Sequence, residues 1–346
     1  MQCFNNELGA IHLYAQGFYT AMNAYGAFTV FMFKRFMERL VENSHSGAKL
    51  NIYRNLPTSE PEAVVHISHG LAEHAGRYRW FMQILRDAGY AVYAHDHRGH
   101  GHTYADDSHK GHFSDIYGID KILHDLDFAI DLIKKNHPNV PIFCFGHSFG
   151  SILLLRYATS SYHRINGIAC WNSGIETNIL AVVGQIILSV ERKFRHPTSN
   201  SYFAWRLTFE SWGNKIKNKR TNFDWLSNDN VQVDRYIKDK LCGFDISLQS
   251  WLDVADAVFY SSQNLSMIPS NFPIFLLGGD QDPCTNYGKD MRKLGARLKR
   301  KGHINLNCET IENCRHETLN EVNRECYVQI FIDWLKEQTN QNLVIK

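Results

Sequence analysis

The sequence predicts an α/β protein in which a mostly parallel central sheet carries helices on both faces. From residue 49 onward, short apolar runs alternate with longer helical stretches, the pattern of strands joined by crossover helices. One buried strand pattern, Pro141–Phe145, leads directly into a glycine-flanked turn and an apolar helix. The 346 residues, 44% hydrophobic and 21% charged, are enough to bury a large core with an insertion.

The first 42 residues form an aromatic extension that precedes this alternation. No Asp, Glu, Lys or Arg occurs from Leu8 to Phe33, and the chain starts without the positive leader of a signal peptide. Residues 30–41 place apolar side chains on one helical face and charged ones opposite, which predicts an amphipathic helix. Three interpretations stay open: an interfacial or core-docking segment, an upstream segment of little function, and a membrane span.

The remaining elements are expected in strict alternation. The strands are expected at Lys49–Arg54, Ala63–Ser68, Ala91–Asp96, Pro141–Phe145, Gly167–Trp171, Phe272–Leu277 and Asn305–Glu309. The helices are expected at Arg77–Ala88, Tyr117–Asn136, Ser148–Ser160, Asn286–Lys301 and Glu321–Gln338. Helices of this length connect parallel strands, so the sheet should be largely parallel.

The alternation breaks at residues 176–245, which we predict to be a helical cap inserted between core segments 43–175 and 246–346. The apolar run Ile179–Val190 precedes the basic, aromatic stretch Glu191–Arg220. That stretch holds eight Lys or Arg against two Glu, a local charge of +6. An insertion of this kind often forms a lid over a site, although the charges alone would also suit a solvated helical face.

Ser148 is the candidate nucleophile. The segment Gly146-His147-Ser148-Phe149-Gly150 follows a strand and opens a helix, the setting that gives the G-x-S-x-G pattern its meaning. A sharp turn there strains the serine and lifts its hydroxyl out of the sheet, while Gly146 and Gly150 remove Cβ atoms where strand and helix crowd together. The Phe149 N–H then points to where an oxyanion would form. The alternative is an ordinary αβ turn with a surface serine.

A serine hydroxyl needs a base and an orienting acid, and two later loops supply them. Asp282 follows one expected strand and His316 the next, giving the order nucleophile, acid, base. Asp280 competes for the acid role, but Asp282 lies deeper in the loop and precedes a proline. His303 and the histidines at 95, 97, 100 and 102 compete with His316, which alone lies between the last strand and the final helix.

The loop after an earlier strand should supply a second oxyanion donor. His69 and Gly70 lead into Leu71, and a glycine turn can aim the Leu71 N–H inward. Glu73 and the residues after it are expected to anchor this loop. Asp96 and Arg98, from the histidine-rich segment after the next strand, are expected to brace the floor of the site. Histidines spaced this closely on a turn diverge, so a metal cluster there is the less favoured interpretation.

Five segments in order resemble the monoacylglycerol lipase/lysophospholipase branch of the α/β-hydrolase superfamily, the serine aminopeptidase S33-like hydrolases. They are His69–Tyr78, Asp96–Gly101, Gly146–Gly150, Gly279–Pro283 and Arg315–Glu321. The resemblance spans about residues 45–340 and leaves the N-terminal extension outside. It implies a triad of Ser148, Asp282 and His316, an oxyanion hole from the Leu71 and Phe149 amides, and a cap that admits one acyl chain.

One departure concerns the residue after the serine. The family often has Met-Gly-Gly there, whereas this chain has Phe149-Gly150-Ser151. The Phe149 backbone can still donate, and we expect its ring to narrow the acyl pocket.

The resulting expectation is an esterase for monoacyl lipids that needs no cofactor and no metal. A small-ester esterase or S33-type aminopeptidase on the same fold, and a non-catalytic binding protein, are the alternatives. The net charge of +2 gives no signal for nucleic acid. The eight cysteines show no C-x-x-C pair, so free thiols and a cytoplasmic location are expected, with peripheral membrane contact through the cap and the N-terminus. The sequence leaves the oligomeric state open.

Overall fold

The computed structural model describes residues 37–177 and 179–344. The strands are β1 (Met37–Asn43), β2 (Lys49–Asn55), β3 (Val64–Ser68), β4 (Ala91–His95), β5 (Ile142–His147), β6 (Gly167–Trp171), β7 (Ile274–Gly279) and β8 (Leu306–Ile311). The helices outside the insertion are α2 (Arg79–Asp87), α3 (Gly118–Asn136), α4 (Phe149–Ser161), α9 (Leu248–Asn264), α10 (Lys289–Arg300) and α11 (Arg324–Val344). Single helical turns include η1 (Ala75–Tyr78) and η5 (Thr318–Asn320).

The strands form one eight-stranded sheet in the order β1-β2-β4-β3-β5-β6-β7-β8. From β4 to β8 in this order all neighbours run parallel, and β2 runs antiparallel to β4. The predicted mostly parallel sheet is confirmed. The carboxyl ends of β3, β5, β7 and β8 therefore meet at one edge, where the loops that follow them can bring side chains together.

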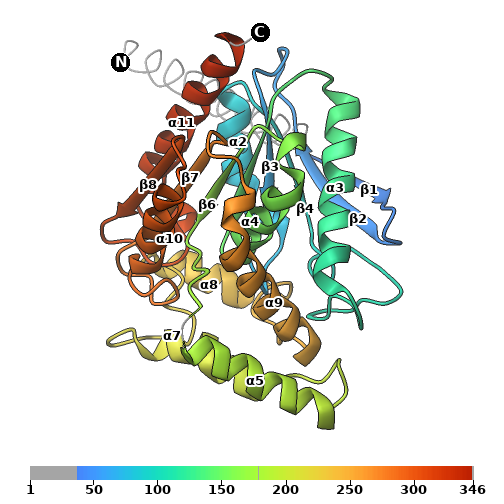
Figure 1. Ribbon diagram of the computed structural model, residues 1–346, viewed down its shortest axis with the longest axis vertical. Coiled ribbons are helices and arrows are strands. Elements are labelled where there is room, and N and C mark those ends of the chain that lie inside the picture. Colours follow the sequence, from blue (N-terminus) through green and yellow to red (C-terminus); the bar gives the residue numbers. More distant parts are fainter. Residues whose placement is uncertain (1–36, 178, 345–346) are drawn as a thin grey trace, which may run out of the picture. The chain divides into compact units, whose positions relative to one another are not determined.

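Different helices cover the two faces of the sheet (Figure 1). Successive strand residues point to opposite faces, so β5 sends Phe143 and Phe145 to one side and Cys144 to the other. Phe145 packs edge-on against Phe81 of α2 and Phe331 of α11. The opposite face packs against α3, α4 and α10. Burial on both sides explains why these strands are continuous apolar runs.

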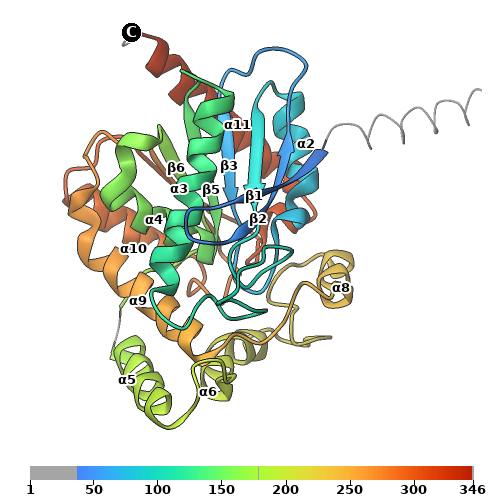
Figure 2. The same cartoon turned by 90° about the vertical axis from the view of Figure 1, so that its right-hand side faces the viewer.

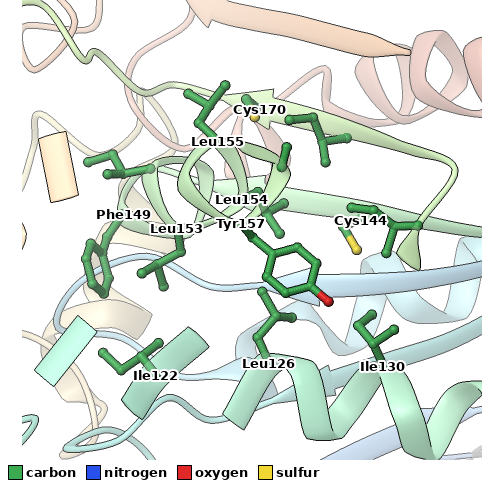
Figure 3. Packing of buried hydrophobic residues seen from close by; sticks show 14 of the residues in the cluster. Ile122, Leu126, Ile130, Cys144, Phe149, Leu153, Leu154, Leu155, Tyr157 and Cys170 are labelled. Atoms are coloured by element: carbon green, nitrogen blue, oxygen red, sulfur yellow. The ribbon is translucent and has the colours of Figure 1, made fainter. Parts of the chain in front are cut away.

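Helix α4 is buried on nearly all sides. Leu153, Leu154 and Tyr157 lie against Leu126 of α3 and against β5 and β6 (Figure 3). A helix that is apolar all round belongs in a core rather than at a surface. This packing fixes the amino end of α4, where Ser148 lies.

The insertion folds into short helices at the carboxyl edge of the sheet (Figure 2). They are α5 (Ile179–Phe194), α6 (Tyr202–Trp205), η3 (Arg206–Glu210), α7 (Ser211–Asn214) and α8 (Asn230–Lys238). Their side chains form an apolar cluster of their own, which includes Phe209, Trp225 and Tyr236 and extends to Ala72 of the core and Trp251 of α9.

Two elements depart from the expected set. The prediction of a helix over residues 30–41 is wrong for residues 37–41, because Met37–Asn43 forms strand β1 beside β2. Residues 1–36, which make up most of the predicted N-terminal extension, lie outside the described residues. Helix α9, Leu248–Asn264, lies where no helix was expected, and it packs on α4 and α5.

Within residues 37–177 and 179–344, no helix combines the length and the apolar character that crossing a bilayer requires. All cysteines of this part of the chain are free thiols.

Candidate active site

Ser148 lies at the tip of the turn between β5 and α4. Its backbone has φ 53° and ψ −116°, and a positive φ is uncommon outside glycine. The Ser148 N–H donates to the carbonyl of Trp171 at 2.9 Å, which ties the turn to the end of β6. Strain held by surrounding structure is what a nucleophile raised above a sheet requires.

Gly146 and Gly150 allow the strand and the helix to approach each other here. A Cβ on Gly150 would lie 2.0 Å from the carbonyl oxygen of Ser68, and one on Gly146 would lie 2.7 Å from the carbonyl carbon of Gly150. Both contacts involve backbone atoms, which cannot move aside as a side chain can. The turn thus requires glycine at both positions.

The expected acid and base meet in the loops after β7 and β8. Asp282 Oδ2 accepts a hydrogen bond from His316 Nδ1 at 2.9 Å, and both side chains are buried. The Asp282 carboxylate also accepts from the Cys284 N–H at 2.9 Å and the Thr285 hydroxyl at 3.0 Å. Asp280, the competing acid, forms no hydrogen bond with His316. The carboxylate at position 282 therefore orients the imidazole.

Ser148 and His316 line the same pocket. In the described chain no hydrogen bond joins the Ser148 hydroxyl to His316, whose Nε2 is the ring nitrogen left for it. Contacts between a nucleophile and its base often tighten only in the substrate complex. The ring is held by Trp225 and His147, each with its ring centroid 4.9 Å away.

The loop after β3 is tied down on both sides of Leu71. The Gly70 N–H donates to Glu73 Oε1 at 2.6 Å, and the Ala72 N–H donates to His100 Nε2 at 3.2 Å. Among the described residues, the N–H groups of Leu71 and Phe149 have no acceptor. Both residues line the pocket beside Ser148. Two unpaired donors near a nucleophile are what an oxyanion needs.

Glu73 anchors the wall beside the serine. Besides the Gly70 N–H, it accepts the Tyr78 hydroxyl at 2.8 Å and pairs with Arg77. Arg77 forms a second, bidentate pair with Glu317 at 2.6 and 2.7 Å. Burial raises the pKa of Glu73, but Arg77, His147 and His69 together outweigh burial, and the pKa lies well below its usual value. Glu73 is thus a charged anchor rather than a proton donor.

His147 links three loops, a role that the sequence analysis missed. Its Nδ1 lies 3.2 Å from Glu73 Oε1, and its Nε2 lies 3.0 Å from the carbonyl oxygen of His316. Both partners are acceptors, so the protonated ring satisfies both of them with its two N–H groups. Burial lowers the pKa of His147, but Glu73, Glu317 and the His316 carbonyl together outweigh burial and raise it. The sequence signal that could have indicated this role was a histidine inside the Gly146–Gly150 turn.

Asp96 and Arg98 support different loops rather than one floor. Asp96 accepts the Ala75 N–H at 2.8 Å and so holds the segment after Glu73. Arg98 reaches Asp125 at 3.0 Å and Asp107 at 2.6 Å, on and near α3. Neither side chain lines the pocket that contains Ser148.

His69 holds the loop as a neutral ring. Its Nδ1 donates to the Gly70 carbonyl at 2.7 Å, and its Nε2 accepts the His97 N–H at 3.0 Å. Burial, followed by the neighbouring His97 and His100, lowers the pKa of His69 well below its usual value. The ring can therefore serve as donor and acceptor at once without carrying a charge.

Two groups of potential metal ligands occur in the described chain, each within 4.8 Å: Asp282, Cys284 and His316, and His74, Asp239 and Cys242. In both groups the histidine is already bonded to the carboxylate, at 2.9 Å. Burial raises the pKa of both thiols, and a protonated thiol is a poor metal ligand. Each group is better described as a hydrogen-bonded pair beside a thiol. The histidines at 95–102 belong to neither.

The pocket that Ser148 faces has a volume of about 210 Å³ and is mostly apolar. Its wall on the side of the insertion and α9 includes Phe209, Trp212, Trp225, Leu226, Trp251 and Val254. The Phe149 ring stacks on Phe113 at 5.5 Å and forms part of the same lining. The acidic and histidine side chains of the lining are Glu73, His147, His316 and Glu317, all on the side of the core.

Comparison with known proteins agrees with this arrangement. The sequence model of the family described as serine aminopeptidase, S33, matches residues 59–323. The monoglyceride lipase of Mus musculus is 35% identical over 112 residues, which are 32% of this chain and 35% of that protein. The monoacylglycerol lipase of Mycolicibacterium smegmatis is 36% identical over 101 residues, 29% of this chain and 34% of that protein. The matched segment thus spans about a third of the length of these relatives.

Solved structures agree over a longer span. A thermostable carboxyl esterase from Bacillus coagulans superposes with a TM-score of 0.81 at 22% identity, over 88% of this chain and 99% of that one. The monoacylglycerol lipase of Paleococcus ferrophilus superposes with a TM-score of 0.61 at 22% identity, over 83% and 99%. At these identities the likeness establishes the fold, which is that of the α/β-hydrolases.

Proposed function

The chain belongs to the serine aminopeptidase S33 family, and we propose that it hydrolyses carboxylic esters of monoacyl lipids with Ser148 as nucleophile. One observation carries this proposal: Ser148 and the Asp282-bonded His316 open into one apolar pocket, beside two N–H groups for which the described residues provide no acceptor. An apolar pocket with a few convergent polar groups is the usual form of a small-molecule site.

In the first half of the proposed reaction, Ser148 Oγ attacks the ester carbonyl while His316 Nε2 takes its proton. Asp282 keeps Nδ1 protonated and stabilises the imidazolium. The oxyanion accepts from the Leu71 and Phe149 amides, and losing one such donor costs about 2.7–4 kcal/mol of barrier. Collapse of this intermediate breaks the ester bond, and the departing alcohol takes the proton from His316.

In the second half, water gives a proton to His316 and attacks the acyl carbon on Ser148. The intermediate collapses, the fatty acid leaves, and the proton returns to the Ser148 oxygen. Every proton removed is returned, so the cycle requires no cofactor or metal.

The apolar wall of the pocket favours a substrate with an acyl chain over a peptide substrate. An aminopeptidase must hold a free amino group, for which a carboxylate is the natural partner. The two carboxylates that line the pocket, Glu73 and Glu317, are both paired with Arg77. A small-ester esterase would not use the Trp and Phe side chains that line the far wall. Monoacyl lipids therefore fit better than either alternative.

We also propose that residues 176–245 act as a cap whose helix α5 contacts a lipid surface. Val183, Ile186, Val190 and Phe194 lie along one face of α5 with 45%, 57%, 49% and 84% of their surface exposed. Exposed aliphatic rows on a helix are typical of interfacial docking. The basic stretch contributes less than its charge suggests, because Arg195, Arg206 and Arg220 pair with acidic neighbours.

A fluorophosphonate probe tests the proposed nucleophile. The wild-type chain should be labelled, and Ser148→Ala should not. Ser160→Ala, an exposed serine at the end of the same helix, is the matched control and should label like wild type. The same proteins should be assayed on monoacylglycerols, lysophospholipids, p-nitrophenyl acetate and aminoacyl amides. Full ester hydrolysis by Ser148→Ala would overturn the mechanism, and preference for aminoacyl amides would overturn the substrate class.

A further inference from the structure

A second cavity lies beside the catalytic pocket. It has a volume of about 290 Å³ and shares Glu73, His147 and Glu317 with the pocket that contains Ser148. Three separate parts of the chain build it: the η1–α2 segment, the cap helix α8, and the segment from Glu317 into α11. The nucleophile is thus near a wall with an apolar pocket on one side and a polar cavity on the other.

The acidic side chains of this cavity are already paired. Glu73 and Glu317 both bind Arg77, and Asp239 binds His74 at 2.9 Å. Arg77 is itself buried between its partners, and burial, which lowers its pKa, is outweighed by Glu317 and Glu73, which raise it well above its usual value. The inner part of the cavity is therefore polar but contributes little net charge.

The rim of the cavity carries three further arginines. Arg79 and Arg235 are exposed, and in the described chain neither forms a salt bridge with a carboxylate. Arg235 makes a long contact, 3.5 Å, with Gln232 Oε1. Arg324 lies 3.9 Å above the Trp80 ring and 3.5 Å from Glu325. Three arginines from α2, α8 and α11 that line one cavity offer a site for an anion. Phosphate is the anion that their planar donors match best.

We propose that this cavity, which we call the arginine cavity, binds a phosphate-bearing head group of the ester substrate. The inference rests on the proposed function, because it places the acyl chain in the apolar pocket and the ester carbonyl at Ser148. The head group then extends past the shared wall of Glu73, His147 and Glu317 into the arginine cavity. There its phosphate contacts the guanidinium groups of Arg79, Arg235 and Arg324. Lysophospholipids with an anionic head group are thus preferred over neutral monoacylglycerols.

Paired substrates with the same short acyl chain test this preference, assayed below the concentration at which micelles form. We expect the wild-type kcat/KM to favour the lysophosphatidic acid over the monoacylglycerol. Added salt should reduce this ratio, because exposed charges are screened. Each of Arg79→Gln and Arg235→Gln should lower the ratio about twofold to fivefold, and the double variant about tenfold.

Arg300→Gln is the matched control, since Arg300 is an exposed arginine on α10 away from this cavity and should leave the ratio unchanged. Glycerol 3-phosphate and inorganic phosphate serve as inhibitors of monoacylglycerol hydrolysis. Inhibition by glycerol 3-phosphate that weakens in Arg235→Gln supports a head-group site. Equal inhibition by both anions without a substrate preference would mean a site for free phosphate and would overturn the proposal.

The outcomes separate this inference from the proposed function. If the wild-type chain hydrolyses both lipids with a ratio that salt and the arginine variants leave unchanged, the arginine cavity is not a head-group site although the lipid esterase stands. If it hydrolyses neither lipid, the proposed function fails and the head-group inference fails with it.

Discussion

At the scale of single residues, hydrogen bonding separates two carboxylates that the sequence places only two positions apart. Asp282 is buried and directs an oxygen to His316 at 2.9 Å, whereas Asp280 has no bond to that ring. If the proposed mechanism holds, only Asp282 keeps His316 in the tautomer that can take a proton from Ser148.

Replacing each carboxylate by its amide should therefore have very different effects. Asp282→Asn should lower kcat about 10³-fold to 10⁴-fold, because the amide favours the wrong tautomer of His316. Asp280→Asn, the matched control, should retain most of the activity. Steady-state kinetics on one ester substrate measure both, with circular dichroism to show that each variant is folded. Comparable losses in both variants would contradict the assignment of the acid.

The positions of Ser148, Asp282 and His316 could be predicted because each follows a strand whose apolar pattern is visible in the sequence. The role of His147 could not, because its partners come from distant segments. Glu73 is 74 residues away along the chain and His316 is 169 residues away. No local sequence pattern indicates that two acceptors will contact the His147 ring. The same holds for Arg98, whose carboxylate partners lie on α3 and in the segment before it.

At the scale of elements, the buried strands could be predicted from the sequence more readily than the exposed edge strand. The central strands are buried on both faces and are apolar throughout, as in Val64–Ser68, so they stand out in the sequence. The edge strand Met37–Asn43 consists of exposed and half-buried residues and has no fully buried one. Its Met37, Leu40 and Val41 have the spacing of a helical face, and only pairing with β2 decides between the two structures.

Helix α5 gives the prediction that belongs to this scale. Val183→Gln with Ile186→Gln should weaken sedimentation with anionic liposomes by about tenfold, because two half-exposed aliphatic side chains no longer enter the bilayer. Ile237→Gln on α8 is the matched control, with 44% exposure in the wild-type chain. Removing residues 1–36, and thus keeping β1, tests the N-terminal segment separately. Unchanged binding in both would exclude the proposed membrane contact.

At the scale of the whole molecule, the response to pH depends on buried histidines more than on the small net charge. Five histidines are almost fully buried: His66, His69, His95, His97 and His100. The His69 and His97 ring centroids are 4.0 Å apart, and those of His66 and His95 are 5.1 Å apart. Burial lowers the pKa of His66 to about 3 and that of His100 to about 4. Charging any of these rings inside the fold is therefore costly.

The free energy of unfolding should consequently fall as the pH drops below about 6.5, because these histidines bind protons in the unfolded chain but not in the folded one. The contribution of His66 to the free energy of unfolding is fully present above that pH and is lost progressively toward pH 3. About 2 kcal/mol of this contribution is lost by pH 5. His147, whose pKa is raised, acts in the opposite direction. Urea unfolding at pH 7, 6 and 5 measures the slope. His66→Leu should flatten it, the exposed His196→Gln should not, and an unchanged slope in His66→Leu would contradict this origin of acid sensitivity.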